Sequence, residues 1–274
     1  MSADNMKRFF TIASLLFCVS APAQVDSLFL LEKFIEGEFT DFTVDNLNNI
    51  YLFNPSGQLK KLRANGDSVA VFNDVRRYGK VNSIDVSNPL KVLLYFKDFG
   101  TVVVLDRFLS KRDVLDLRKL GLYQVKAIAQ SYDNGFWVFD EQEGKLKHLN
   151  DGGAIVDQFT DFRVLFDSMP SPQFIADQNK YLYLYDEQKG IYIFDYYGAF
   201  KKRIAFTGWK EFTVINNILF GRTEQQLFRY EPGSLQLQEY TIPASMAQAL
   251  KIKITPEYLY VLRPERLEIY SYKR

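Results

Sequence analysis

The sequence predicts an all-β fold, a six-bladed β-propeller in which each blade is a four-stranded antiparallel sheet. Three observations indicate this fold. Short apolar runs of strand length alternate with turns rich in Gly, Pro, Asn and Asp. The strand–turn pattern occurs six times at intervals of roughly 40 to 45 residues, the period of a propeller blade. The repeats also begin with one strand too many and end with one too few, as a closed ring requires.

The clearest copy of the repeat is FTDFTVDNLNNIYLFNPSGQLKKLRANGDSVAVFN, residues 39–73. Residues 39–44 alternate as a half-buried strand, and residues 50–53 form the continuous apolar run of a strand covered on both faces. Segments 58–63 and 68–73 complete the four strands. Asn, Asp and Gly separate them because these residues tolerate left-handed backbone angles. Such a small sheet cannot bury both faces alone, so it has to repeat.

Five later copies follow the first one along the chain. They begin at Ser83, Ala127, Gln173, Glu211 and Leu250. Their second strands align on apolar triplets with aromatic residues, which favours one common register. The fifth copy departs from the pattern, because Gly221-Arg222-Thr223 is expected to interrupt its second strand.

The two ends of the repeat region predict how the ring closes. The last copy supplies only three strands before Arg274, whereas the apolar segment 27–34 lies ahead of the first copy. Lending that N-terminal strand to the last blade removes the open sheet edges. A solenoid would instead need capping ends, and the sequence offers none.

Residues 1–23 are predicted to form a secretory signal peptide. Met6-Lys7-Arg8 supplies the positive start, residues 9–19 the apolar region, and Ala21-Pro22-Ala23 the small-residue cleavage pattern. The apolar region is too short to span a bilayer. We therefore expect export, to the periplasm or cell envelope, with no membrane insertion after cleavage.

The mature chain, residues 24–274, is expected to be one propeller domain without cysteine. Cys18 is the only cysteine and lies inside the apolar region of the signal. Phe17 before it is large, which disfavours a lipoprotein signal. Stability must then come from burial alone, and about 250 residues suffice for that.

The composition excludes several classes of function. A formal net charge of +1 argues against a nucleic-acid or anionic-membrane surface. The single histidine, His148, is expected in an outer strand as a packing or surface residue. With no other histidine and no mature cysteine, a transition-metal site is not expected. No phosphate-binding glycine loop occurs, so we assign no cofactor, no metal ligand and no catalytic residue, and we expect a monomer.

Carboxylates are the remaining candidates for metal binding. The near copies 140–144 and 186–190 lie at equivalent turns, where Asp and Gly are wanted for turn geometry, and neither has the spacing of an EF-type loop. Asp45, Asp85 and Asp177 on inner strands are expected to point into the central channel. Three oxygens within about 2.3–2.6 Å of one point would mark a calcium site there.

The connections from each outer strand to the next inner strand carry the candidate binding residues. These residues are Arg76, Arg77, Tyr78, Lys80, Arg118, Lys119, Tyr123, Arg163, Trp209 and Lys210. If the connections converge, they form a basic, aromatic-rimmed surface suited to a carboxylate-bearing peptide or an anionic glycan. The alternative is ordinary solvated loop charge.

The pattern D-x-x-N-N-I-Y-L-F-x-x-x-G-Q-L-K-K-L-x-x-N-G, residues 45–66, resembles the NHL-type six-bladed β-propeller. As an exported protein, the chain is also similar to propeller proteins of Bacteroidetes-type bacteria, and Gln24 directly after the predicted cleavage site supports this resemblance. The resemblance implies the fold but no activity, since such relatives include binding modules, lactone hydrolases and cyclases. The Glu, Asn and Asp set of the metal-dependent hydrolases cannot be placed on these inner strands.

These observations lead to a function hypothesis with one main alternative. We expect a non-enzymatic, exported binding or scaffold propeller that engages a protein or peptide partner through its loop face. The alternative is a divalent-cation-dependent hydrolase of a sugar or lactone, acting in the central channel. A purely structural envelope protein would show neither a basic loop face nor a pocket.

Overall fold

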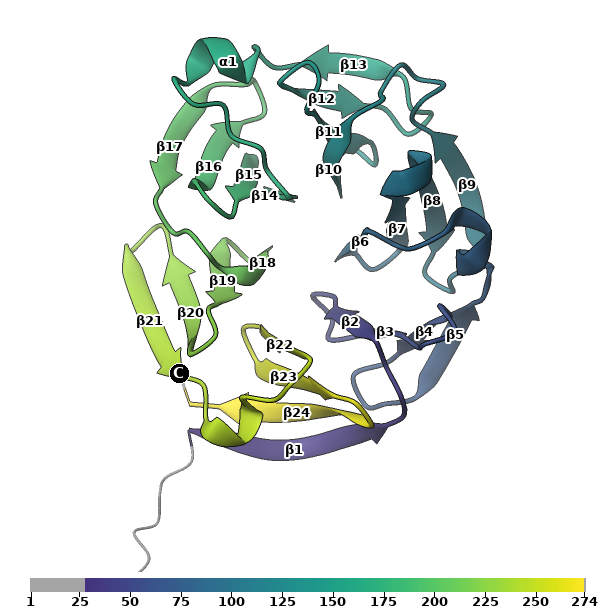
Figure 1. The fold of residues 1–274 in the computed structure, drawn as a ribbon, viewed down its shortest axis with the longest axis vertical. Helices are drawn as coiled ribbons and strands as arrows, with labels where there is room; N and C mark the ends of the chain where they lie inside the picture. The colour runs from purple at the N-terminus through teal and green to yellow at the C-terminus, as the bar shows by residue number, and fades with distance from the viewer. Residues whose placement is uncertain (1–27, 274) are drawn as a thin grey trace, which may run out of the picture.

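The computed structural model describes residues 28–273, which form a closed ring of six four-stranded antiparallel sheets (Figure 1). The predicted all-β, six-bladed propeller is therefore confirmed. The predicted blade starts agree with the first residue of each inner strand to within two residues. The predicted signal peptide, residues 1–23, and Cys18 lie outside the described residues.

Each blade runs from an inner strand at the channel to an outer strand at the rim. Blade 1 comprises β2 (Asp41–Val44), β3 (Ile50–Phe53), β4 (Leu59–Leu62) and β5 (Ser68–Phe72). Blade 2 comprises β6 (Ser83–Asn88), β7 (Lys91–Phe96), β8 (Thr101–Asp106) and β9 (Lys111–Asp116). Blade 3 comprises β10 (Val125–Gln130), β11 (Phe136–Asp140), β12 (Lys145–Leu149) and β13 (Ile155–Gln158). Blade 4 comprises β14 (Phe174–Gln178), β15 (Tyr181–Asp186), β16 (Gly190–Asp195) and β17 (Phe200–Ile204). Blade 5 comprises β18 (Lys210–Ile215), β19 (Ile218–Arg222), β20 (Gln226–Glu231) and β21 (Gln236–Thr241).

Blade 6 closes the ring as the sequence predicts. Its three C-terminal strands are β22 (Lys251–Ile254), β23 (Tyr258–Arg263) and β24 (Arg266–Tyr272), and β1 (Phe29–Glu36) is its outer strand. β1 pairs antiparallel with β24, from Phe29 opposite Tyr272 to Glu36 opposite Arg266. The two ends of the described chain therefore meet in one sheet, and the ring has no open blade.

The core consists of layers between neighbouring blades. The layer between blades 1 and 2 contains Tyr51 and Phe53 together with Leu94 and Phe96. The layer at the closure is of the same kind, and Tyr260 of blade 6 packs there against Phe42 of blade 1 with ring centroids 6.0 Å apart. Burial on both faces explains the continuous apolar runs of the second strands.

The expected interruption in blade 5 does not occur. β19 continues through Gly221 and Arg222 and pairs with both neighbours, Gly221 lying opposite Phe228. The glycine serves packing, since a Cβ at this position would lie 2.5 Å from the ring of Trp209. Glycine here lets an indole lie directly on the strand.

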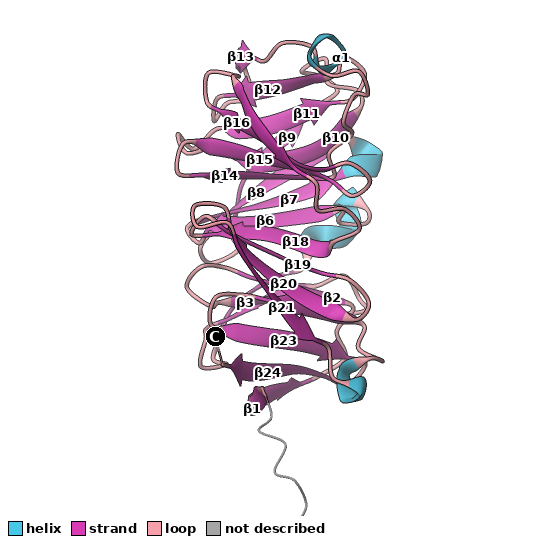
Figure 2. Ribbon diagram, turned by 90° about the vertical axis from the view of Figure 1, so that its left-hand side faces the viewer, coloured by secondary structure: helices cyan, strands magenta, loops and turns pink. Residues whose placement is uncertain are grey.

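The connections divide between two faces of the ring. One face carries the connections between blades, with η1 (Asp74–Tyr78), α1 (Phe162–Leu165) and η3 (Ala244–Met246), and also η2 (Lys97–Phe99) within blade 2. Figure 2 shows these helices together on one side. We call it the long-connection face, and the opposite side the short-turn face. No helix among residues 28–273 is long and apolar enough to cross a membrane.

Candidate functional site

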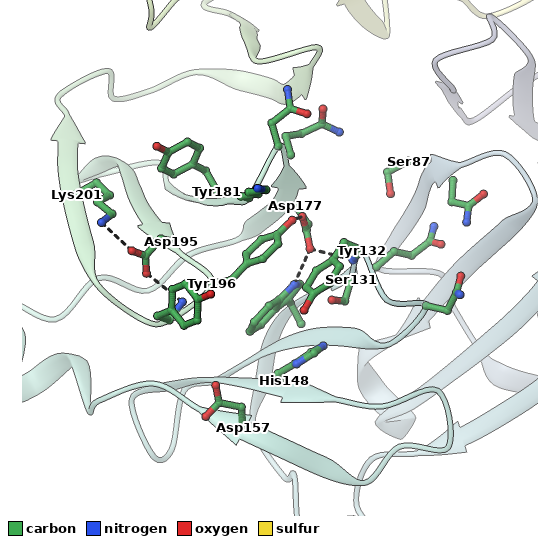
Figure 3. A pocket seen from close by; sticks show the side chains of 18 residues that line it. Ser87, Ser131, Tyr132, His148, Asp157, Asp177, Tyr181, Asp195, Tyr196 and Lys201 are labelled. Carbon is green, nitrogen blue, oxygen red and sulfur yellow. Dashed lines mark hydrogen bonds and ion pairs between the residues drawn. The ribbon is translucent and has the colours of Figure 1, made fainter.

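A cavity of about 1010 Å³ opens on the short-turn face, between blades 3 and 4 (Figure 3). Blade 3 contributes the β10–β11 turn and His148 of β12, and blade 4 contributes the β14–β15 and β16–β17 turns. Ser87, next to the β6–β7 turn of blade 2, lies across the opening. This volume is at the upper end of the range of ligand pockets, about 300–1,000 Å³.

The carboxylate of Asp177 organises the floor of this cavity. Its Oδ2 accepts hydrogen bonds from the indole Nε1 of Trp137 at 2.8 Å and from the backbone N–H of Tyr132 at 3.0 Å. Its Oδ1 accepts from the hydroxyl of Tyr196. Burial raises the pKa of Asp177, although these hydrogen bonds oppose the change. The carboxylate is thus fully used in holding blade 3 to blade 4.

Two aromatic pairs stand above this floor. Tyr132 and Tyr196 stack with ring centroids 4.5 Å apart and planes inclined by only 8°. Trp137 and His148 stack at 4.3 Å. Burial raises the pKa of Tyr196, and the Asp177 carboxylate adds to the effect, so the hydroxyl stays protonated and donates. The aromatic wall is therefore held in one orientation.

His148 is a packing residue, as the sequence suggests, but it also lines the cavity. It lies on β12 with its side chain largely buried against Trp137, and its Nε2 is 3.1 Å from Asp133 Oδ1. Partial burial of Asp133 acts to raise its pKa. Hydrogen bonds from the backbone N–H of Gly135 and from His148 outweigh this effect, so the pKa of Asp133 is lowered. The histidine is thus placed by its stack and one carboxylate, without a nucleophile on its other nitrogen among the described residues.

Left-handed turn residues present amide groups at the rim. Asn134 has φ 69°, and Asn179 and Lys180 have φ 49° and 69°. Asn tolerates this conformation better than most residues. The turn chemistry that ends each inner hairpin therefore also supplies polar side chains to the cavity. The cation Lys201, by contrast, is paired with Asp195 at 2.7 Å.

The central channel holds a second, smaller cavity of about 130 Å³ that is lined by inner strands and shares Ser87, Asp177 and Gln178 with the short-turn cavity. Lys253 of β22 points its ammonium at Thr43 Oγ1, 3.0 Å away. Burial, with Lys251 nearby, lowers the pKa of Lys253 to about 8. It is the only lysine or arginine among the described residues that line the channel.

The three channel aspartates of the sequence prediction do not share a point. Asp45 Oδ1 accepts from the backbone N–H of Leu47 and of Asn49, each at 2.9 Å. Asp85 Oδ2 accepts from the backbone N–H of Gln130 at 2.7 Å, and Asp177 serves the blade junction. Over residues 28–273 no group of three or more His, Cys, Asp or Glu is arranged to hold a metal ion.

The turn carboxylates serve local geometry. Asp140 accepts from the backbone N–H of Gln142 and forms a buried ion pair with Lys147 at 2.8 Å. Asp186 accepts from the backbone N–H of Gln188 and of Ser171. Both are Asx-type turns of the kind that Asp favours.

The predicted binding residues lie on the long-connection face, and those of blades 1 and 2 come together there. A Cβ at Gly79 would meet the ring of Phe99, and one at Gly100 would meet the Arg118 side chain. The Arg118 guanidinium donates to the carbonyl of Asp98 at 2.7 Å. The connections after β5 and β9 thus both pack against η2.

Several of the predicted residues join this surface. Arg77 lies over the ring of Tyr78, 5.8 Å from its centroid, and Tyr78 packs on buried Phe96. Tyr123, on the same connection as Arg118, is 65% exposed. Arg76 lies on η1, and its side chain is not described. Lys119 is 3.9 Å from Asp116.

The other predicted residues do not join it. The prediction that Trp209 lies on the binding surface is corrected by its burial. It is only 5% exposed and stacks on Phe228, with ring centroids 4.9 Å apart, in the core layer between blades 4 and 5. Arg163 is held by Asp161 at 2.7 Å, and Lys210 pairs with Glu224. The connections between blades therefore do not form one continuous basic rim.

A groove of about 390 Å³ lies beside the joined residues on the same face, between blades 1 and 2. Its walls include Phe53 at the end of β3, Asn54 of the β3–β4 turn, and the segment 79–84, with Lys80. Arg77, Lys80 and Arg118 have no carboxylate within ion-pair distance in the described part of the chain. We call Arg77, Tyr78, Lys80, Phe99, Arg118, Lys119 and Tyr123 the basic patch.

The sequence prediction missed the short-turn cavity altogether. Its residues come from turns about 45 residues apart, and each reads as ordinary turn chemistry. One signal was present, since Tyr132 is an aromatic residue in the short turn that follows the inner strand of blade 3. Only the ring geometry brings it to Tyr196.

Comparison with known proteins identifies the fold. No protein-family model matches the chain, and no curated protein matches its sequence. Among solved structures, it is similar to virginiamycin B lyase from Staphylococcus aureus, with 12% identity, a TM-score of 0.60 and coverage of 88% of this chain and 99% of the lyase. It is also similar to a WD40 domain from Neurospora crassa, with 8% identity, a TM-score of 0.57 and coverage of 90% and 96%.

A third similar structure is PorZ of Porphyromonas gingivalis, described as a bacterial surface component of the type-IX secretion system. The identity is 13%, the TM-score is 0.50, and the match covers 90% of this chain and 39% of PorZ. At such low identity these similarities establish the architecture alone. This chain therefore shares the β-propeller fold with proteins of very different activities.

Proposed function

We propose that this chain is an exported, non-enzymatic binding propeller that engages an acidic segment of a protein or peptide partner through its long-connection face. The observation that carries the proposal is the basic patch beside the 390 Å³ groove. Its loops are fixed by packing at Gly79 and Gly100, so its side chains are positioned before a partner arrives.

The charge of the patch favours a carboxylate-bearing partner. Arg77, Lys80 and Arg118 are exposed cations that no acidic side chain neutralises among residues 28–273. Guanidinium groups bind carboxylates with two hydrogen bonds, and the exposed rings of Phe99 and Tyr123 supply apolar area beside them. Electrostatic attraction of this kind speeds association and falls with ionic strength.

The alternative, a cation-dependent hydrolase in the central channel, has less support. The channel aspartates are occupied by protein donors, and the channel volume of about 130 Å³ is small for a sugar or lactone. We also propose a periplasmic or cell-envelope location, which rests on the N-terminal sequence pattern alone. A monomeric state and an NHL-type repeat are proposed as well.

The test is capture of partners from a cell-envelope extract by the immobilised mature chain, with chemical cross-linking to name the contact residues. We expect a protein that cross-links near residues 77–123 and is lost from the variant Arg77→Ala/Lys80→Ala/Arg118→Ala. The matched control Arg107→Ala/Arg112→Ala/Lys202→Ala removes the same charge elsewhere and should keep the partner. Equal loss in both variants would indicate a general charge effect and contradict the proposal.

A further inference from the structure

The short-turn cavity has an unusual lining. Of the 18 described residues that line it, none is aliphatic, although ligand pockets are mostly apolar. Tyrosine, tryptophan and histidine supply all of its rings, and amides, carboxylates, hydroxyls and amines supply the rest. The core layer between blades 3 and 4 combines aromatic rings with the aliphatic side chains of Leu146, Ile175, Leu182 and Leu184, so the absence of aliphatic side chains belongs to the cavity. This lining suits a ligand that is polar around its edge and flat on one face.

The aromatic wall is exposed and rigid at once. Tyr132 is 64% exposed, yet its ring is held by the stack on Tyr196 and its backbone N–H by Asp177. Tyr181 and Tyr197 add two further exposed rings from blade 4. A tyrosine side chain has few rotatable bonds, so ordering it on ligand binding costs little conformational entropy. Exposed aromatic area that is already fixed favours stacking with a ligand.

The polar groups around these rings have hydrogen-bonding capacity to spare. The side-chain amides of Asn134, Gln178 and Asn179 have no protein partner in the described part of the chain. Each offers a carbonyl acceptor and an NH₂ donor, which together match a hydroxyl that donates and accepts. The amides flank the rings on the blade 3 and blade 4 turns. The carboxylate of Asp177, by contrast, already accepts hydrogen bonds from Trp137 and from the backbone of Tyr132.

The charges of the cavity nearly cancel. Lys201 is paired with Asp195, and Lys180 and Asp157 have opposite signs. The third carboxylate, Asp177, already accepts three hydrogen bonds from protein donors. Neither an anionic nor a cationic ligand finds an excess of the opposite charge. This separates the cavity from the basic patch on the other face.

We propose that the short-turn cavity binds a neutral oligosaccharide. A pyranose ring has a face of C–H groups that stacks on an aromatic ring, and a rim of hydroxyls that amides can bind. Tyr132 and the rings beside it provide the stacking surface for the C–H face. The hydrogen-bonding groups for the hydroxyls are the amides of Asn134, Gln178 and Asn179. The volume of about 1010 Å³ accommodates more than one sugar ring. This site is independent of the partner surface under the proposed function.

The experiment is affinity electrophoresis and calorimetry of the mature chain with neutral glucans, mannans, xylans and chito-oligosaccharides. Polygalacturonate, heparin and proline-rich peptides are included as charged and peptide ligands. We expect at least one neutral glycan to bind and Tyr132→Ala to weaken its affinity by at least about tenfold, a change that calorimetry resolves. Asn179→Gly removes the amide but still accepts the left-handed backbone at this position, so it should weaken the same glycan without lowering the melting temperature.

Tyr123→Ala is the matched control, because Tyr123 is 65% exposed on the opposite face. It should leave glycan binding unchanged and weaken the protein partner, whereas Tyr132→Ala should do the reverse. No binding of any neutral glycan at about 10 mM, a level that detects even millimolar affinity, would overturn the proposal. Binding only of peptides or of anionic polymers, or glycan binding that Tyr132→Ala leaves intact, would overturn it equally.

Discussion

Asp177 on the inner strand of blade 4 accepts a hydrogen bond at 2.8 Å from the indole Nε1 of Trp137 on the second strand of blade 3. The same carboxylate also binds the backbone of Tyr132 and the hydroxyl of Tyr196. A single side chain therefore joins two blades and fixes the aromatic wall of the cavity. Its loss should affect stability and binding together.

Asp177→Ala should lower the free energy of unfolding by about 3 kcal/mol, because it leaves buried donors without acceptors. Asp177→Asn keeps one carbonyl acceptor and should cost less. Urea unfolding followed by the fluorescence of the two tryptophans measures both. Asp157→Ala, at an exposed position in the same cavity, should stay within about 0.5 kcal/mol. Equal effects of Asp177→Ala and Asp157→Ala would contradict the role of the junction.

Calcium and EDTA should leave the melting temperature unchanged. A cation that binds only the folded state raises the midpoint by mass action, but Asp45, Asp85 and Asp177 already accept protein hydrogen bonds. Differential scanning fluorimetry with about 5 mM Ca²⁺ or EDTA tests this. A clear shift with Ca²⁺, reversed by EDTA, would instead favour the cation-dependent hydrolase.

Gly221→Ala should destabilise blade 5 by about 1–3 kcal/mol, the usual effect of overpacking. The added Cβ would lie 2.5 Å from Trp209, whose ring is fixed between Phe206 and Phe228. Gly233→Ala is the control, since nothing lies within 4 Å of a Cβ there. Thermal unfolding compares the two. A loss no larger for Gly221→Ala than for Gly233→Ala would show that the indole can move aside.

Gly221 also shows where sequence reasoning succeeds and where it stops. Strand existence, blade starts and ring closure follow from local apolar runs and turn residues, and they are correct. The sequence alone predicts a strand interruption at this glycine. The residue that explains the glycine, Trp209, lies just before the inner strand of the blade, and its contact with Gly221 is not visible in the sequence. Local propensity cannot show a contact made across a sheet. The same limit misplaced Trp209 on the surface.

The functional surfaces are harder to predict for a related reason. The basic patch was partly foreseen, because cations and rings cluster within each connection. The short-turn cavity was not, because Tyr132 and Tyr196 stand on two different turns and Asp177 stands on an inner strand. Each turn is unremarkable alone, and only the angle between blades 3 and 4 brings them together. Which loops face each other is a property of the closed ring.

Lys253 should make stability depend on pH in the alkaline range. Its folded pKa is lowered by burial to about 8 from the ordinary 10.5, so the folded state holds fewer protons than the unfolded state between these values. Stability attributable to Lys253 therefore rises as pH increases through this window and is lower below it. Unfolding free energies of the native chain and of Lys253→Met across this range should show a smaller slope in the variant. Equal slopes would contradict the assignment.

Removal of β1 should abolish the monomeric propeller, because it exposes the edge of β24 along seven paired positions. It also removes Phe29, which is buried against Tyr272. A chain starting at residue 38 is expected to aggregate or unfold, by light scattering and circular dichroism, whereas a chain starting at Gln24 should remain monomeric. Adding a synthetic peptide of residues 28–36 should restore the melting transition of the shortened chain, since β1 is held to β24 by backbone hydrogen bonds and side-chain packing. An unchanged melting temperature without the peptide would mean that the ring does not depend on this closure.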